Sequence, residues 1–263
     1  MKFRPRLLSA TADNSKGGKE SIPSRLKGMA SAMIILGLIY FGLGISADLA
    51  VNIVPPRTEA RWFSWAEDLI GPTLPVPDDL QQVFDQLTQD SKLDDFPYHL
   101  VFLPTDEINA FALPGGLIAV TQGLYETVRT REGRALVLGH EIGHVQHRHG
   151  LQRIGRSILL AGALSLAGVD TATVLKRGQF LADLQFSRSQ ESDSDDFGMR
   201  LIFRVYGTTK GSMEFFENLE SLDLDDVDTL QGQLGTFLRT HPQTSDRLED
   251  LRKLAQELES ESL

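Results

Sequence analysis

The residues best suited to chemistry are two histidines and a glutamate in the stretch His140-Glu141-Ile-Gly-His144. On a helix, positions four apart share a face, so His140 and His144 can point both imidazoles at one metal ion. Glu141 is offset around the helix, where its carboxylate can accept a proton from water that the metal makes more acidic. The pattern predicts two metal ligands and a general base. The alternative is a pair of surface histidines on an ordinary helix.

A metal ion held by two histidines needs at least one further protein ligand. His147 is too far along the same helix to reach that ion, so we expect His147 and His149 to lie at the surface or behind the ligands. Glu191 and Asp195 are better candidates, because they are four apart and their carboxylates can face the same way. One could bind the metal while the other holds a ligand imidazole through its free N–H. The same two residues could instead belong to a solvated acidic face.

The elements that must carry these residues follow from hydrophobic periodicity. The sequence predicts helices over residues 78–91, 132–149 and 187–198, a strand over 98–103, and two short strands within 111–120 that are joined by a Pro-Gly-Gly turn. We therefore expect an α+β body that is mainly α-helical.

Before this body comes an uncharged segment of 20 residues, 28–47. A helix of that length covers about 30 Å, the hydrocarbon thickness of a bilayer. The first 47 residues carry a net charge of +5, with seven basic and two acidic side chains, whereas the remainder carries −15, with 19 basic and 34 acidic. We expect a retained transmembrane anchor, with the basic arm cytoplasmic and the body on the periplasmic or exoplasmic side. A cleaved secretory signal and a buried helix are the alternatives.

The length, cysteine content and net charge of the chain exclude several classes of protein. The 263 residues are enough for one sizeable domain with an appendage. The absence of cysteine excludes disulfides, thiol catalysis and every cysteine-based metal site. The net charge of −10 argues against nucleic acid as the main partner. Nothing in the sequence sets the oligomeric state.

Four ordered stretches resemble the membrane-associated gluzincin metallopeptidases that include HtpX, BepA and the type I CAAX prenyl protease. They are Asn109-Ala-Phe-Ala-Leu-Pro-Gly-Gly116, the zinc helix from His140 to His149, the signature Ser187-Arg188-x-x-Glu191-x-x-x-Asp195-x-x-Gly198, and Thr240-His241-Pro242 with Arg247 further on. The resemblance implies a zincin-like metalloprotease domain whose small β-sheet lines the active site with its edge strand. Together with the charge pattern, the uncharged segment and the prolines after it, this gives the organisation: basic arm 1–27, anchor 28–47, Pro-rich linker 48–77 and zinc metallopeptidase domain 78–263.

The resemblance implies a role for each matched residue around the metal. His140, His144 and Glu191 would bind one zinc ion. Glu141 would be the general base and then the general acid, taking a proton from the attacking water and passing it to the leaving amine. Asp195 would orient a histidine ligand.

Other matched residues would bind the substrate, assist catalysis or regulate access to the metal. The backbone of Asn109, Ala110 and Phe111 would form the edge to which an extended polypeptide substrate adds as a strand. His241 would stabilise the oxyanion or occupy the open position on zinc, unless it is a capping or loop histidine. Arg247 would pair with Asp195 or with Asp193, unless it is a plain surface charge.

The function implied by this resemblance is hydrolysis of internal peptide bonds. With one predicted span the chain is more similar to the BepA-like group than to relatives with several spans, which favours misfolded envelope or membrane proteins as substrates. Two other functions stay open. One is a chaperone-like binder that rarely cuts because zinc is held closed, and the other is a secreted soluble metalloprotease.

Overall fold

The computed structural model describes residues 22–90, 92–166, 186–221, 237, 240, 241 and 245–261. The chain divides into two units, Met1–Gly42 and Leu43–Leu263. Helix α1 (Ile22–Val51) contains the segment 28–47 that the sequence predicts to cross a bilayer. Among the residues described, no helix combines the length and apolarity that a membrane crossing needs. The predicted span is therefore not confirmed.

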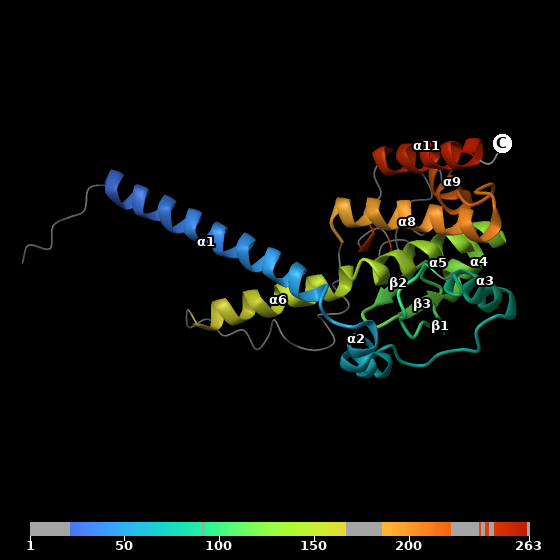
Figure 1. Ribbon diagram of the computed structural model, residues 1–263, viewed down its shortest axis with the longest axis horizontal. Coiled ribbons are helices and arrows are strands. Elements are labelled where there is room, and N and C mark those ends of the chain that lie inside the picture. Colours follow the sequence, from blue (N-terminus) through green and yellow to red (C-terminus); the bar gives the residue numbers. More distant parts are fainter. Residues whose placement is uncertain are drawn as a thin grey trace, which may run out of the picture. The chain divides into compact units, whose positions relative to one another are not determined.

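The second unit contains a small sheet and helices, as Figure 1 shows. In chain order its elements are α2 (Pro56–Phe63), the 3₁₀ helix η1 (Ser64–Leu69), α3 (Asp78–Thr88), β1 (His99–Leu103), β2 (Ala110–Leu113), β3 (Leu117–Thr121), α4 (Gln122–Thr127), α5 (Arg131–Gln146), α6 (His149–Leu166), α8 (Arg188–Tyr206), α9 (Glu214–Ser221) and α11 (Ser245–Glu261). The expectation of a mainly helical α+β fold is confirmed.

The sheet has the strand order β1-β3-β2, with β3 parallel to β1 and antiparallel to β2. The hairpin between β2 and β3 turns at Gly115 and Gly116, whose φ angles of 95° and 100° suit glycine. Ala60 of α2 lies so close to Gly115 that a Cβ there would be 2.7 Å from the Ala60 Cα. Segment 48–77, predicted to be a linker, thus packs against this turn through α2. Strand β2 is left at one edge of the sheet.

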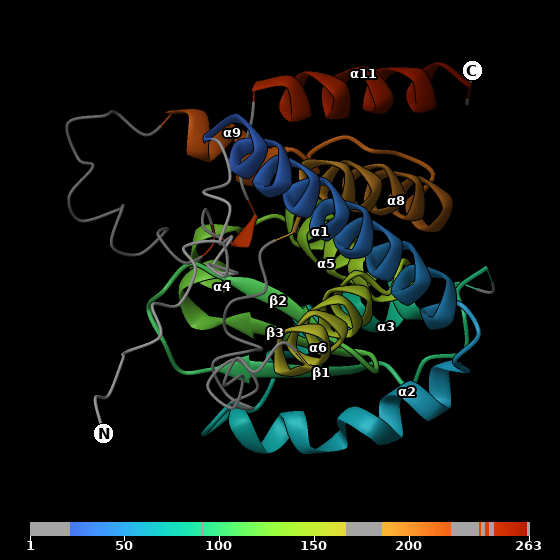
Figure 2. The same cartoon turned by 90° about the vertical axis from the view of Figure 1, so that its left-hand side faces the viewer.

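Helix α5 lies between the sheet and α8, and α11 covers the far side of α8 (Figures 1 and 2). Every residue of α5 from Ala135 to Val145 is buried. This is possible because apolar and glycine residues occupy all sides of the helix, and two of its three polar side chains in this stretch, His140 and His144, have buried partners. Ile142 of α5 and Ile118 of β3 belong to the same hydrophobic core, which also takes in Met199 and Ile202 of α8.

Small residues let α5 and α8 approach until their backbones touch. A Cβ added to Gly139 would lie 3.1 Å from the Gly198 Cα, and one added to Gly143 would lie 3.0 Å from the Ser194 Cα. The two helices therefore meet through residues four apart on each, which is the spacing of one helix face. The side chains on either side of this contact, His140 and His144 on α5 among them, are brought close to α8.

Helix α8 begins where the sequence places its start. The Ser187 hydroxyl accepts a hydrogen bond from the Gln190 backbone N–H at 3.3 Å, and the Gln190 side chain accepts one from the Ser187 N–H at 3.1 Å. This capping box satisfies two backbone donors that the helix itself leaves unpaired. The helix ends at Gly207, which has a φ of 70°.

The prediction of one helix over residues 132–149 is wrong at its C-terminal end. Helix α5 ends at Gln146, and α6 begins at His149. Between them Arg148 takes a left-handed conformation with a φ of 55°, which costs roughly 1–2 kcal/mol for a residue with a Cβ. The Arg148 guanidinium donates to the backbone carbonyls of Val51 and Val54, 97 and 94 residues earlier in the chain. The break has a tertiary cause, so local periodicity does not reveal it.

Replacing Gly198 with alanine should separate α5 from α8. The new Cβ would lie 2.8 Å from the His140 backbone nitrogen, and backbone cannot move aside as a flexible side chain can. We expect Gly198→Ala to lower the free energy of unfolding by about 1–3 kcal/mol, the usual cost of overpacking. Urea unfolding measures this loss. Gly162→Ala is the matched control, since a Cβ at Gly162 of α6 meets nothing within 4 Å. Equal stability of the two variants would contradict the account.

Candidate metal centre

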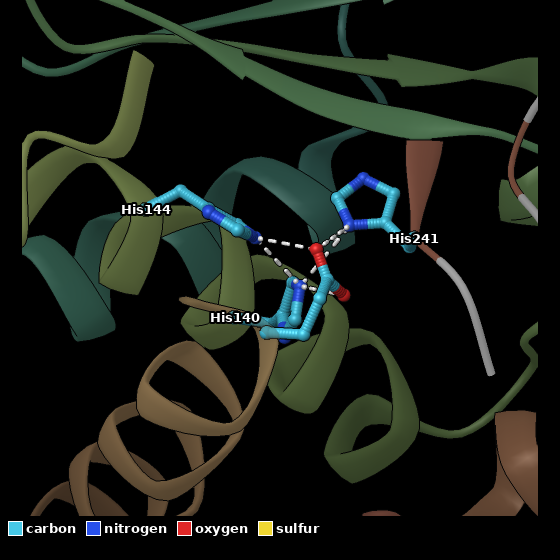
Figure 3. A group of neighbouring side chains, drawn as sticks. His140, His144 and His241 are labelled. Atoms are coloured by element: carbon cyan, nitrogen blue, oxygen red, sulfur yellow. Dashed lines mark hydrogen bonds and ion pairs between the residues drawn. The ribbon is translucent and has the colours of Figure 1, made fainter. Parts of the chain in front are cut away.

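Four buried side chains bring possible metal-binding atoms together between α5 and α8. His140 and His144 come from α5, Glu191 comes from the first turn of α8, and His241 comes from the segment before α11. One donor atom from each lies within 4.8 Å of all the others. Figure 3 shows the rings of His140, His144 and His241 turned toward one another.

The donor set fits a zinc ion in chemistry and in spacing. Four donors bound to zinc at about 2.0–2.1 Å in a tetrahedron lie about 3.3–3.4 Å from one another. The Nε2 atoms of His140 and His144 are 3.0 Å apart, and His140 Nε2 is 3.3 Å from His241 Nδ1. The Glu191 Oε1 atom lies 3.5 Å from His144 Nε2 and 3.2 Å from His241 Nδ1. Nitrogen atoms this close suit a shared cation.

Behind the donors, Asp195 and Arg247 form a buried ionic network. The His140 Nδ1 lies 2.8 Å from Asp195 Oδ1, so the ring can donate there while its Nε2 faces the other donors. Arg247 of α11 donates to both oxygens of Asp195, at 2.7 and 2.9 Å. A third nitrogen of Arg247 lies 2.8 Å from Glu191 Oε2. Of the partners that the sequence suggested for Arg247, Asp195 is the one found.

With its carboxylates ionised and its histidines neutral, this region has more negative than positive side chains. Glu141, Glu191 and Asp195 are buried carboxylates, and Arg247 is the buried guanidinium that contacts two of them. When all three carboxylates are ionised, the group carries two uncompensated negative charges, which a divalent ion would neutralise. Burial opposes ionisation of Glu191, yet the imidazoles of His144 and His241 beside it hold its pKa far below the usual range. Glu191 is therefore an anion, as a metal ligand must be.

Glu141 lies beside the donors and is fully buried. Among the residues described, neither of its carboxylate oxygens has a hydrogen-bond partner. An ionisable neighbour is His241, whose Nε2 is 3.6 Å from Glu141 Oε1. Burial raises the Glu141 pKa, against the opposing effect of His241, His140 and the backbone amide of Ala112. A buried carboxyl with a raised pKa and free lone pairs suits a group that accepts and releases a proton.

The two histidines beyond the motif occupy different environments. His147 is exposed, whereas His149 is 3% exposed and its Nδ1 lies 3.0 Å from the Nδ1 of His144. Burial lowers the His149 pKa to about 3. Phe186, just before α8, stacks on the His144 ring at a centroid distance of 3.8 Å. Sequence reasoning missed Phe186, for which the only signal is its position beside the Ser187-Arg188 signature.

The edge of β2 runs beside this cluster, but the predicted substrate-binding residues differ in what they offer. Asn109 is committed to the neighbouring strand, since its N–H donates to Thr121 Oγ1 and its carbonyl accepts from the Thr121 N–H. Because backbone groups alternate across an antiparallel pair, those of Ala110 and Ala112 point to the unpaired edge. Phe111 is half-buried and packs on the face of the sheet away from α5. The edge groups near the donors are thus those of Ala110 and Ala112.

Two of the three residues in the last predicted motif, Thr240-His241-Pro242, are among those that the structure describes. Thr240 and His241 are buried, and Pro242 lies outside the described residues. His241 reaches the donors although it stands 101 residues after His140 in the chain. Its other ring nitrogen, Nε2, has no hydrogen-bond partner among the described residues.

Comparison with known proteins gives a consistent picture. The sequence pattern of peptidase family M48 matches residues 77–255. Metalloprotease YcaL of Escherichia coli is 31% identical over 157 residues, which are 56% of this chain and 58% of that protein. The beta-barrel assembly-enhancing protease of E. coli is 30% identical over 176 residues, 62% of this chain and 35% of that protein. Mitochondrial metalloendopeptidase OMA1 of Schizosaccharomyces pombe is 27% identical over 184 residues, 66% of this chain and 51% of that protein. The chain thus spans about half the length of these relatives.

Removing the charge of Arg247 should destabilise the fold. Arg247→Met keeps the aliphatic stem but leaves Glu191 and Asp195 buried without their guanidinium partner. Breaking a buried ion pair on one side costs about 3–5 kcal/mol. Urea unfolding with and without chelator measures the loss and separates it from any contribution of bound metal. Lys253→Met is the matched control on the same helix, because Lys253 pairs with Glu249 at the surface. A variant at Arg247 as stable as this control would contradict the assigned role.

Proposed function

We propose that this chain, which belongs to peptidase family M48, hydrolyses internal peptide bonds at one zinc ion. The ligands we assign are His140, His144 and Glu191. One observation carries the proposal: three buried donors meet beside Glu141, a buried carboxyl whose oxygens have no partner among the described residues. Ligands, base and a free strand edge then stand together, as peptide hydrolysis requires.

The proposed mechanism assigns each step to a group of this chain. Zinc, when bound, lowers the pKa of water and polarises a carbonyl. Glu141 accepts a proton from the attacking water and later delivers it to the leaving amine. Asp195 accepts the Nδ1 proton of His140 and so keeps the Nε2 lone pair of that ring directed at the donors.

We assign substrate binding to the edge of β2. The backbone groups of Ala110 and Ala112 would pair with an extended polypeptide, which then runs past Glu141. Pairing through main-chain atoms depends little on side chains, and it selects for unfolded or loosely folded segments, because a folded protein hides its backbone. We infer that the substrates are misfolded proteins of the cell envelope or membrane. The name of one relative, the beta-barrel assembly-enhancing protease, supports a role of this kind.

The general-base assignment predicts loss of cleavage without loss of metal. Glu141→Gln keeps the side-chain shape but cannot take up a proton, so cleavage of casein should fall by about 10²–10⁴-fold. Zinc content by mass spectrometry should stay that of the wild type. Glu132→Gln, on the same helix but away from the donors, should cleave normally. If Glu141→Gln cleaves as fast as the wild type, the chain is not a peptidase of this kind.

The position of His241 favours a second function, binding of unfolded polypeptide with little cleavage. Its Nδ1 lies with the zinc donors, at 3.2 Å from Glu191 Oε1, where it would fill the position that water needs. His241→Ala decides between the two functions in the same casein assay. Faster cleavage by this variant supports a closed, gated site. Slower cleavage supports a direct role of His241 in stabilising the oxyanion and removes the gate.

Attachment to a membrane through residues 28–47 stays a prediction, with the body on the periplasmic or exoplasmic side. It is supported by the basic arm and by the exposure of Ile34, Ile35 and Leu38 on α1.

Extraction of membranes with alkaline carbonate tests this attachment. If the apolar side chains hold the chain in lipid, the full-length protein should stay in the pellet, because carbonate strips only peripheral proteins. Replacing Ile34, Ile35 and Leu38 with aspartate should release it, since each charge is costly in the hydrocarbon region. A wild-type chain that appears in the supernatant would rule out the anchor. N-terminal sequencing that begins near Asp48 would show a cleaved signal.

A further inference from the structure

The chain leaves helix α5 through a turn that is held by residues outside that helix. Arg148, in its left-handed conformation, donates to the carbonyls of Val51 and Val54 and lies 3.6 Å from the Glu59 carboxylate. Its guanidinium also stands over the Phe96 ring, 5.4 Å from the centroid. These contacts offset the strain of the left-handed residue. The direction in which the next residue points is therefore fixed by the fold.

That next residue is His149, and the turn brings its ring back against a proposed zinc ligand. The Nδ1 atoms of His149 and His144 are 3.0 Å apart, and the two rings meet edge to face at an angle of 72°. Ser194 of α8 lies 3.4 Å from the same nitrogen of His149. Had α5 continued regularly through Arg148, the ring of His149 could not have turned back in this way.

The distance between the two nitrogens, together with the lone pair that metal binding needs, assigns their protons. At 3.0 Å one nitrogen donates and the other accepts. The His144 Nε2 faces His140 and Glu191, so it needs its lone pair to bind a metal. His144 then carries its proton on Nδ1, and this N–H donates a hydrogen bond to Nδ1 of His149, whose own proton lies on Nε2.

We propose that His149 is a positioning residue, which fixes the tautomer and ring orientation of His144 so that Nε2 binds zinc. This inference rests on the proposed zinc site. The two histidine ligands then have different partners behind them. His140 donates to the charged Asp195, whose charge Arg247 offsets, whereas His144 donates to a neutral imidazole. A neutral acceptor adds no further negative charge to a cluster that already holds three carboxylates.

Zinc affinity tests this role without reference to cleavage. The dissociation constant is measured by competition with a chromophoric chelator on the full chain. His149→Phe keeps a ring but removes the acceptor, and we expect affinity to fall about 10–100-fold, as for other lost partners of metal-bound histidines. His149→Asn, whose carbonyl oxygen can replace the accepting nitrogen, should restore most of it. His147→Phe, at the exposed neighbouring histidine, should bind zinc like the wild type.

The outcomes separate this inference from the proposed function. Wild-type affinity in His149→Phe would overturn the positioning role alone, provided that the wild type binds zinc. Equal weakness of the asparagine and phenylalanine variants would also overturn it, because ring packing would then be what matters. Should His149→Phe fail to fold, His149→Ala replaces it as the variant without an acceptor. A wild type that binds no zinc would defeat the proposed function itself.

Discussion

The contact between the backbones of α5 and α8 is the constraint on which the rest of the centre depends. Gly139 and Gly143 on one helix face Ser194 and Gly198 on the other, and a Cβ added to any of the three glycines would lie 2.8 to 3.1 Å from backbone, closer than van der Waals contact. At this separation, His140 and His144 reach the carboxylate of Glu191. Larger residues would push the helices apart, and the donors would no longer share one ion.

This contact also concentrates charge in the interior, which the fold must offset. Arg247 reaches in from α11 to join Asp195 and Glu191, and the remaining negative charge falls where the imidazole nitrogens converge. A divalent cation would offset this negative charge, and it would also give the converging imidazole nitrogens a common partner. The fold and the metal are thus linked, since the arrangement that binds the ion is costly without it.

Much of this centre could be predicted from the sequence because it depends on helical spacing. The pairs His140 and His144, and Glu191 and Asp195, are each four apart, so their shared faces follow from local geometry. The hairpin with its Pro-Gly-Gly turn is equally local. His241 is predicted from the resemblance to a family, because it lies 101 residues after His140 and helical spacing cannot relate residues so far apart.

What could not be predicted depends on distant parts of the chain. The end of α5 at Gln146 requires Arg148 to meet Val51 and Val54, which periodicity does not register. The burial of His149 follows from that break. Proline content indicated a linker over residues 48–77, yet α2 within it packs on the β2–β3 turn and Glu59 accepts from the Gly115 N–H.

One zinc ion should lie among His140, His144 and Glu191. Anomalous X-ray diffraction at the zinc absorption edge, on crystals of the purified chain, tests it most directly. We expect a single strong peak about 2.0–2.2 Å from Nε2 of both histidines and from a carboxylate oxygen of Glu191. A crystal grown with zinc that shows no peak there, or a peak at other residues, would contradict it.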